Sequence, residues 1–338
     1  MKDNKLLTLG IETSCDETAA AVTANGREAL SNVIFSQIET HKAFGGVVPE
    51  IASRRHLENI NEVIEGALLE ACVEPAQIDM IGVTKGPGLV GALLIGIACA
   101  KTLAFVWEKP LIGVHHIQGH ISANYIAHRE LEPPFTALVV SGGHTSIVEV
   151  MDYNRCRVMG KTRDDAVGEA YDKVARVLGL SYPGGPAIDD IAKRGNPHSV
   201  EFKRVFLEKG SYDFSFSGTK TGVLNYLNSE KQAGREICPA DVAASFQLSI
   251  IEVLVSKAAD AAQTAKHGKL ALAGGVAANS LLRQMLSAEC EKRQITLYCP
   301  PSVLCTDNAA MIGCAAYYKY MAGEHDGLDL DAHANLEL

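Results

Sequence analysis

Residues 6–26 carry the sequence LLTLGIETSCDETAAAVTANG, and this stretch decides the fold. The apolar residues 6–11 predict a strand, the hydroxyl-rich residues 13–18 a tight turn, and the apolar residues 19–23 a second strand. Asn25-Gly26 is a strong hairpin signal at the end of that second strand. The chain is therefore expected to open with a pair of antiparallel strands joined by a polar turn.

The same strand–turn–strand layout is predicted again at residues 135–151, FTALVVSGGHTSIVEVM, although the amino acids differ. Between the two copies, apolar spacing predicts strands at 80–84 and 110–114 and helices at 54–72, 91–105 and 116–127. A third glycine-rich turn, GGVAAN at 274–279, follows a predicted strand at 269–273 and opens another helix. Two copies of one strand–turn–strand layout predict a duplicated α/β unit with a ligand between the halves.

The length of 338 residues exceeds what one hydrophobic core usually supports, so two domains are expected. We place the first domain at residues 1–134, completed by a C-terminal helix at about 307–330. The second domain then covers residues 135–306. A stretch rich in Gly, Ser and Lys at 184–234 is predicted to be an insertion on it.

The composition is that of an ordinary globular protein, with 47% hydrophobic and 21% charged residues. The net charge of −9 disfavours non-specific attraction to a polyanion, so an RNA partner would need a local basic patch or a helper subunit. Nine cysteines without a CxxC pair predict a reduced, cytoplasmic protein. The apolar stretch 86–106 is interpreted as a glycine-rich turn feeding a buried helix, and no membrane association is expected.

His116 and His120 stand four residues apart, so on a helix both imidazoles project from one face and can share a metal ion. Asp307, in another polar turn before a predicted helix, is the candidate third ligand. Two histidines and one carboxylate with open positions suit non-haem iron or zinc, and composition does not choose between them. The alternative is a pair of half-buried histidines at a helix start.

The glycine-rich turns predict anion and purine binding. Ser141-Gly142-Gly143 can bring bare backbone N–H groups to phosphate oxygens. The turn at 274–279 offers a flat floor for a purine, with Asn279 able to bond the sugar or phosphate. A P-loop is excluded, and a dinucleotide fold is disfavoured, because neither glycine pattern is present. Residues 164–172 are interpreted as a solvated acidic helix start, and residues 184–189 as a turn followed by an acid.

Taken together, the motifs resemble one family along nearly the entire chain, the tRNA N6-adenosine threonylcarbamoyltransferases of the bacterial TsaD type. The resemblance implies the α/β actin-like ATPase fold, with two RNase H-like domains around a nucleotide cleft. The segments that carry it are GIETSCDET at 10–18, GGVVPEIASR at 45–54, GPGLVGALLIG at 86–96, VHHIQGH at 114–120, VVSGGHT at 139–145, DDAVGEAYDKVARVLGL at 164–180, YPGGP at 182–186, FSFSGTKT at 214–221, GGVAAN at 274–279 and CTDNAAMIG at 305–313.

The resemblance also implies a reaction, in which the threonylcarbamoyl group of threonylcarbamoyl-AMP passes to N6 of the adenosine 3′ of the anticodon and AMP leaves. The tRNAs concerned read codons that begin with A. It implies one divalent metal per chain, Fe²⁺ in preference to Zn²⁺, with ATP or ADP able to occupy the cleft. The family's metal ligands fall on His116, His120 and Asp307. Its substrate-binding positions fall on Val139, Val140, Ser141, Gly142, Gly143, Asp172, Gly185, Asp189 and Asn279.

The acceptor amine is a poor nucleophile, so a nearby acid could take its proton, and Asp16 and Glu17 are the catalytic candidates. The resemblance implies that the chain works with helper proteins, namely a TsaB-like paralogue and a TsaE-like ATPase, with the adenylate supplied by a TsaC-like enzyme. The basic stretches at 161–163, 193–194 and 203–204 are candidate tRNA contacts. Scattered basic pairs are more often simply solvated surface.

Three other functions are alternatives to this one. A zinc peptidase needs HExxH, whereas Ile117 follows His116 and the general base is missing. A kinase of this fold would use Asp in the first turn, where this chain has Glu12. A non-enzymatic actin-like scaffold would need the cleft but not a complete metal triad.

Overall fold

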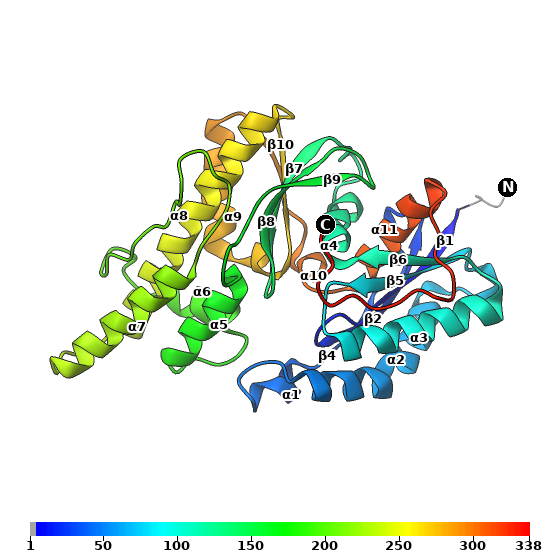
Figure 1. The fold of residues 1–338 in the computed structure, drawn as a ribbon, viewed down its shortest axis with the longest axis horizontal. Coiled ribbons are helices and arrows are strands. Elements are labelled where there is room, and N and C mark those ends of the chain that lie inside the picture. Colours follow the sequence, from blue (N-terminus) through cyan, green and yellow to red (C-terminus); the bar gives the residue numbers. More distant parts are fainter. Residues whose placement is uncertain (1–4) are drawn as a thin grey trace. The chain divides into compact units, whose positions relative to one another are not determined.

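The computed structural model describes residues 5–338, and the chain divides into two compact units (Figure 1). The first unit contains residues up to Pro133, together with Asp152–Cys156 and Pro300–Leu338. The second unit contains Pro134–Met151 and Arg157–Cys299. The C-terminal segment therefore packs with the N-terminal part of the chain.

The first unit is built on a mixed sheet with the strand order β3-β2-β1-β5-β6, and β4 pairs with β2. Strands β1 and β2 are antiparallel, whereas β5 and β6 run parallel to β1. The predicted hairpin after β2 is confirmed, since Asn25 and Gly26 both have positive φ and β3 pairs back onto β2. The strands are β1 (Leu7–Glu12), β2 (Glu17–Ala24), β3 (Glu28–Ala29), β4 (Val33–Ser36), β5 (Met80–Gly86) and β6 (Leu111–His115).

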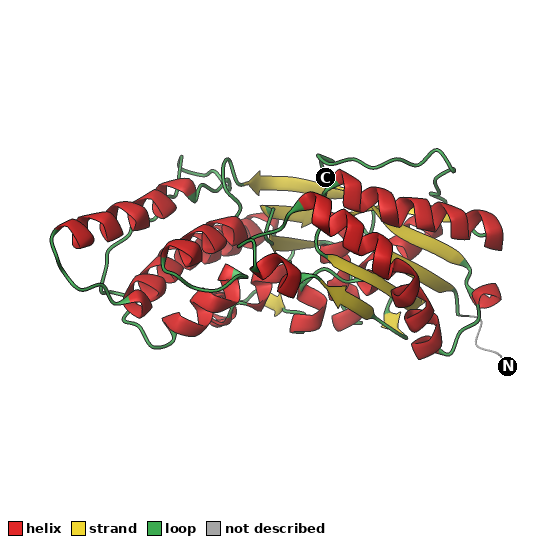
Figure 2. Ribbon diagram, turned by 90° about the horizontal axis from the view of Figure 1, so that it is seen from below, coloured by secondary structure: helices red, strands yellow, loops and turns green. Residues whose placement is uncertain are grey.

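Helices cover both faces of this sheet (Figure 2). On one face, α2 (Pro49–Ala71) and α3 (Val90–Trp107) pack over the core formed by Leu9, Ile11 and their neighbours. On the other face lie α4 (His116–Ala127) and α11 (Ala309–Met321). Shorter helices are α1 (Ile38–Lys42), η1 (Pro75–Gln77) and α10 (Ser302–Cys305).

Helix α2 begins at Pro49, five residues before the predicted start at Arg54. Proline is favoured at the first helical position because it has no backbone N–H to leave unpaired and its φ is already helical. The apolar periodicity on which the prediction rested begins only after this first turn.

Helix α11 lies unusually close to the sheet of the first unit. A Cβ on Gly10 would lie 2.2 Å from the carbonyl oxygen of Ala309, and one on Gly82 would lie 2.5 Å from Cβ of Ala316. Glycine is therefore required in β1 and β5 to let the helix backbone approach. This approach fixes the start of α11, and with it Asp307, two residues before the helix.

The second unit has its own sheet, with the order β11-β10-β7-β8-β9. The predicted strand pair is confirmed, because β7 and β8 are antiparallel with Val140 opposite Thr145. The strands are β7 (Phe135–Val140), β8 (Thr145–Val150), β9 (Cys156–Lys161), β10 (Lys269–Ala273) and β11 (Thr296–Tyr298). The helices are α5 (Val167–Val177), α6 (Gly184–Ala192), α7 (Ser217–Gln232), α8 (Pro239–Ala265), η2 (Gly275–Ala278) and α9 (Ser280–Lys292).

Two expectations about the second unit are wrong. Residues 184–189 form the start of α6 instead of a turn, since Pro186 lies in the first helical turn, where proline is tolerated. The acids Asp164 and Asp165 are not merely solvated. Asp164 accepts hydrogen bonds from the N–H groups of Phe216 and Ser217 at the start of α7. Asp165 forms ion pairs with Lys173 and Lys220.

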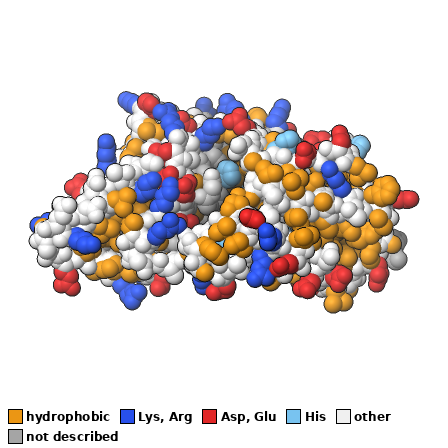
Figure 3. Space-filling view, turned by 60° about the horizontal axis from the view of Figure 1, so that its bottom comes forward, with side chains coloured by type: hydrophobic (Ala, Val, Ile, Leu, Met, Phe, Trp, Pro, Cys, Tyr) orange, Lys and Arg blue, Asp and Glu red, His pale blue; other side chains and the backbone are white. Residues whose placement is uncertain are grey.

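Two helices, α3 and α8, are long and apolar enough to cross a membrane by length and composition, which is weak evidence by itself. In α8, 89% of the most apolar 18-residue stretch is buried, as in a core helix. In α3, only 33% of the corresponding stretch is buried. The expectation that α3 is a buried helix is therefore wrong for its outer face. That face exposes Phe105 and Val106, and α2 beside it exposes Leu57 and Leu69. Figure 3 shows hydrophobic side chains gathered on the right of the view.

Candidate functional site

The first unit brings the three predicted metal ligands together. Helix α4 starts at His116, directly after β6, so one helical turn places His116 and His120 on the same side. Nε2 of His120 lies 3.1 Å and Nε2 of His116 lies 3.5 Å from Oδ1 of Asp307. One ligand atom from each residue lies within 4.8 Å of the others.

The chemistry of these donors fits a metal ion. His120 is almost fully buried, and neither of its ring nitrogens makes a hydrogen bond to any residue in the part of the chain described. Leaving buried imidazole nitrogens without partners costs free energy unless another group binds them. Two imidazoles and a carboxylate suit a transition metal with open coordination positions. The three side chains therefore form a candidate metal centre.

Behind this centre lies Glu12, the last residue of β1, which is completely buried. Its Oε2 accepts a hydrogen bond from Oγ1 of Thr84 at 2.6 Å and lies 3.1 Å from Nδ1 of His116. Its Oε1 accepts a hydrogen bond from the backbone N–H of Ser14. Sequence reasoning used Glu12 only as an argument against a kinase. The available signal was an acid at the carboxyl end of a buried strand, where ligand sites gather.

The charges of these groups are strongly coupled. Burial lowers the pKa of His116, but the carboxylates of Asp307 and Glu12 outweigh burial and raise it to about 9. Burial raises the pKa of Glu12, yet the charge of His116 outweighs it and holds that pKa below its ordinary value. Without metal at neutral pH, a protonated His116 therefore lies between two carboxylates. A metal ion would have to displace the proton from its Nε2.

The acids proposed for catalysis lie at the end of the turn after β1, where Asp16 is the last turn residue and Glu17 is the first residue of β2. Asp16 is buried and Glu17 is half-buried, with its Oε1 accepting from Oγ of Ser36. Burial raises the pKa of Glu17 well above its ordinary value, and the charges of Asp16 and Asp307 raise it further. The turn is held by His56 of α2, which bonds Oγ1 of Thr18 at 2.8 Å and the carbonyl of Cys15 at 2.9 Å.

In the second unit, the turn after β7 is open. Cβ atoms added to Gly142 or Gly143 would meet nothing within 4 Å. The carbonyls of Ser141 and Gly142 accept from the N–H groups of Gly168 and Glu169 at the start of α5. Within residues 5–338, the N–H groups of Gly142 and Gly143 donate no hydrogen bond. These two amides can bind an anion. Val139 and Val140 are fully buried in β7 and can contribute only their backbone.

The remaining predicted substrate residues are linked to one another in the same unit. Oδ1 of Asp172 accepts from the N–H of Gly184 at 2.7 Å, and the next residue, Gly185, faces open space. Asp189 accepts from Oγ of Ser280 at 2.9 Å. Each ionised carboxylate has about four lone-pair positions, so it can accept more than one hydrogen bond, sugar hydroxyls included.

Both polar groups of the Asn279 side chain make hydrogen bonds within the protein. Its Oδ1 caps α9 by accepting from the N–H of Leu282, and its Nδ2 donates to Oε1 of Gln247 at 3.0 Å. Gln247, buried on α8, donates in turn to Asp189 at 3.2 Å. Sequence reasoning missed Gln247, because a single glutamine in an apolar helix carries no motif.

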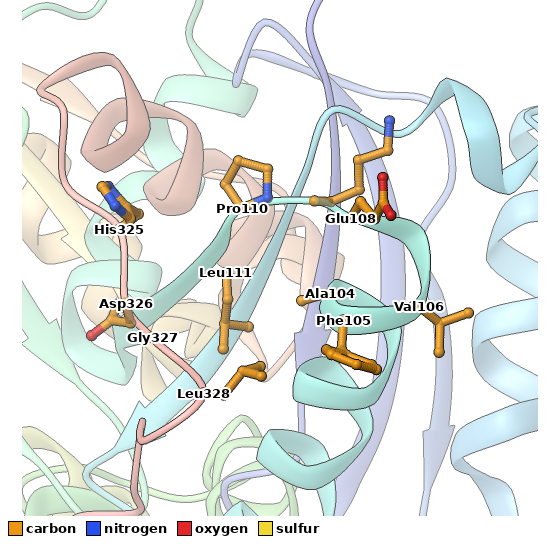
Figure 4. A pocket seen from close by; sticks show the side chains of 11 residues that line it. Ala104, Phe105, Val106, Glu108, Pro110, Leu111, His325, Asp326, Gly327 and Leu328 are labelled. Carbon is orange, nitrogen blue, oxygen red and sulfur yellow. The ribbon is translucent and has the colours of Figure 1, made fainter.

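A pocket of about 720 Å³ lies elsewhere in the first unit, between the end of α3, the start of β6 and the segment after α11 (Figure 4). Phe105, Leu111 and Leu328 supply its apolar lining, with Glu108 and His325 beside them. None of the predicted site residues lines it.

Comparison with solved structures shows the fold. The chain is similar to HypF from T. kodakarensis, with a TM-score of 0.64 and 15% identity over 94% of this chain and 48% of that one. It is also similar to the activator of the 2-hydroxyisocaproyl-CoA dehydratase from Clostridium difficile, with a TM-score of 0.55 and 13% identity over 94% and 97% of the two chains. The expected actin-like ATPase fold is confirmed.

Comparison of sequences shows the family. The family model of tRNA N6-adenosine threonylcarbamoyltransferase, TsaD, matches residues 28–314. Curated proteins of that name are 56% identical over 98% of both chains in Clostridioides difficile and 57% identical over 99% of both chains in Clostridium perfringens. The resemblance inferred from the motifs is confirmed. The chain belongs to the family of tRNA N6-adenosine threonylcarbamoyltransferases.

Proposed function

We propose that the chain transfers the threonylcarbamoyl group of threonylcarbamoyl-AMP to N6 of the adenosine 3′ of the anticodon, in tRNAs that read codons beginning with A, and releases AMP. The observation that carries this proposal is the cluster of His116, His120 and Asp307. The cluster lies in a chain that is 56% identical, over 98% of both lengths, to a protein named as this transferase.

His116, His120 and Asp307 would hold one divalent metal, Fe²⁺ in preference to Zn²⁺. When bound, it would supply a Lewis acid for a carbonyl or phosphoryl oxygen. The protein's own contribution is to keep these ligands fixed and nearly dry, since both imidazoles are buried.

The second unit would bind the adenylate. The amides of Gly142 and Gly143 have the free N–H groups that a phosphate requires. Asp172 and Asp189 would accept from ribose hydroxyls, and Gly185 and residues 274–279 would leave room for the base. ATP or ADP carries the same adenosine and phosphate groups and would occupy this set as well.

Asp16 and Glu17 would orient the acceptor amine and take its proton. A carboxyl whose pKa lies well above its usual range is a stronger base than an ordinary surface carboxylate. The raised pKa of Glu17 supports this role.

We further propose that the chain acts in the cytoplasm with tRNA and helper proteins, namely a TsaB-like paralogue, a TsaE-like ATPase and a TsaC-like source of adenylate. Two features support the need for helpers. Three of the basic residues proposed to contact tRNA are already in ion pairs. These pairs are Arg163 with Glu208 and Asp213, Lys193 with Asp190, and Arg204 with Glu252. The exposed apolar side chains of α2 and α3 are typical of a protein-binding surface.

The experiment is to incubate the purified chain, with and without these helpers, with threonylcarbamoyl-AMP and unmodified tRNA. The tRNA is then digested to nucleosides for mass spectrometry. We expect threonylcarbamoyladenosine from the parent chain and from His128→Ala, a histidine outside the metal cluster, but not from His116→Ala or Asp307→Ala. Absence of product under every combination, with AMP binding intact, would instead support the non-enzymatic scaffold.

A further inference from the structure

The two histidines of the metal centre are held in different ways. Neither ring nitrogen of His120 makes a hydrogen bond within the described chain, and its polar contact is Asp307, whose Oδ1 lies 3.1 Å from Nε2. His116 has a carboxylate behind it, because Nδ1 lies 3.1 Å from Oε2 of Glu12. The hydroxyl of Ser14 lies 3.2 Å from the same nitrogen. Glu12 and Ser14 are therefore the residues placed to control the proton on Nδ1.

A carboxylate in this position determines which ring nitrogen of His116 carries the proton in the metal-bound state. An ionised carboxyl only accepts hydrogen bonds, so Nδ1 must be the donor. The lone pair then lies on Nε2, the nitrogen that faces Asp307 at 3.5 Å. Metal-binding histidines commonly donate their other N–H to a carboxylate in this way, which fixes the ring and raises its basicity.

Two other donors hold the Glu12 carboxylate in this orientation, one on each oxygen. Oγ1 of Thr84 donates to Oε2, the same oxygen that His116 approaches, and the N–H of Ser14 donates to Oε1. The side chain is completely buried, so water does not compete for it. Glu12 is the last residue of β1, so the strand backbone fixes the direction in which its side chain leaves the sheet.

We propose that Glu12 is the positioning residue of the metal centre, which holds His116 with its proton on Nδ1 and its lone pair on Nε2 toward the metal. This inference rests on the metal centre of the proposed function and assigns to Glu12 a role that the three ligands do not cover. Ser14 supports the carboxylate, and Thr84 keeps it in place.

Glu12→Gln tests the proton directly while preserving the shape of the side chain. The N–H of Ser14 requires an oxygen opposite it, so the amide NH₂ of the glutamine would face Nδ1 of His116. The imidazole would then accept at Nδ1 and carry its proton on Nε2, where the metal must bind. We expect the affinity for Zn²⁺, measured by competition with a chromophoric chelator, to fall about 10- to 100-fold.

Two variants serve as controls. Ser14→Ala removes the second partner of Nδ1 but leaves the carboxylate, and its Zn²⁺ affinity is expected to stay within about threefold of the parent. Thr84→Val removes one restraint on Glu12 without changing its charge, and a loss of about 2- to 10-fold is expected. Thr84→Val also keeps the proposal testable if Glu12→Gln does not fold. The visible absorption of bound Co²⁺ reports whether a histidine ligand has been lost.

The outcomes separate this inference from the proposed function. If His116→Ala abolishes Zn²⁺ binding but folded Glu12→Gln binds within about twofold of the parent, Glu12 is not a positioning residue. Zn²⁺ affinity unchanged in Thr84→Val and lowered in Ser14→Ala would likewise overturn it, in favour of the serine hydroxyl. If His116→Ala and Asp307→Ala both bind Zn²⁺ normally, the metal centre itself is wrong.

Discussion

The turn after β1 and the turn after β7 have the same backbone setting but opposite chemistry. Each joins two antiparallel strands of its own sheet. The first is closed, with Glu12, Asp16 and His116 buried around it. The second is open, with two glycine amides that have no protein partner in the described chain. One strand–turn–strand layout therefore presents buried carboxylates beside the candidate metal centre in one unit and exposed backbone N–H groups in the other.

The difference teaches that the strand–turn–strand layout specifies where a site lies and the side chains of the turn specify what it binds. Carboxylates at a buried strand end need cationic or donor partners, and this chain supplies them from His116 and Thr84. Glycine amides need only exposure. Changes that crowd the closed turn should therefore have larger effects than changes at the open one.

The largest effect is expected for Gly10→Ala in β1. The new Cβ would lie 2.2 Å from the carbonyl oxygen of Ala309 and 2.7 Å from the N–H nitrogen of Gly313, both backbone atoms that cannot rotate away. We expect the free energy of unfolding to fall by about 3 kcal/mol or more, measured by urea denaturation. Zn²⁺ binding should weaken too, because α11 fixes Asp307. A variant as stable as the parent would show that this unit is not closely packed at the helix.

Gly168→Ala should damage the open turn selectively. Its Cβ would lie 2.7 Å from Cα of Gly142 and 2.7 Å from the carbonyl oxygen of Ser141, so the turn must move. We expect the affinity for AMP, measured by isothermal titration calorimetry, to fall about tenfold, equivalent to about 1.4 kcal/mol. Zn²⁺ affinity should not change. Equal losses of AMP and Zn²⁺ binding would contradict the separation of the two turns.

A pH-dependent effect is expected for Glu17→Gln, at the start of β2 beside the closed turn. Burial and the charges of Asp16 and Asp307 raise the pKa of Glu17 in the folded chain above that in the unfolded chain. The parent therefore loses stability as pH rises from about 4.5 through the raised pKa, whereas the glutamine variant does not ionise. Urea denaturation of metal-free protein should find the variant more stable at pH 8 and equal to the parent near pH 4. A difference that does not depend on pH would argue against a raised pKa.

The smallest effect is expected for Gly142→Ala. A Cβ there would meet no atom within 4 Å, so the free energy of unfolding should stay within about 0.5 kcal/mol of the parent. This variant is the matched control for Gly168→Ala, since it adds the same methyl group to the turn from the solvent side. Destabilisation comparable to that of Gly10→Ala would mean that the open turn is packed after all.

Much of this molecule is determined by its sequence alone. The strand pairs, the hairpin at Asn25-Gly26, the two strand–turn–strand layouts and the pairing of His116 with His120 follow from local patterns, because strand and helix periods are local properties. The family follows from motifs spread over the whole chain. Sequence also suggested Asp307, although 187 residues separate it from His120.

Only the tertiary structure decided which polar groups meet. Glu12, Thr84 and His116 come from three separate elements, and Gln247 reaches Asp189 and Asn279 from the middle of α8. Such contacts are set by how strands and helices pack, not by spacing along the chain. The same is true of the exposed face of α3, whose composition alone predicted burial. A hydrophobic sequence gives the tendency to be buried, and only the arrangement of neighbouring elements shows whether that tendency is satisfied.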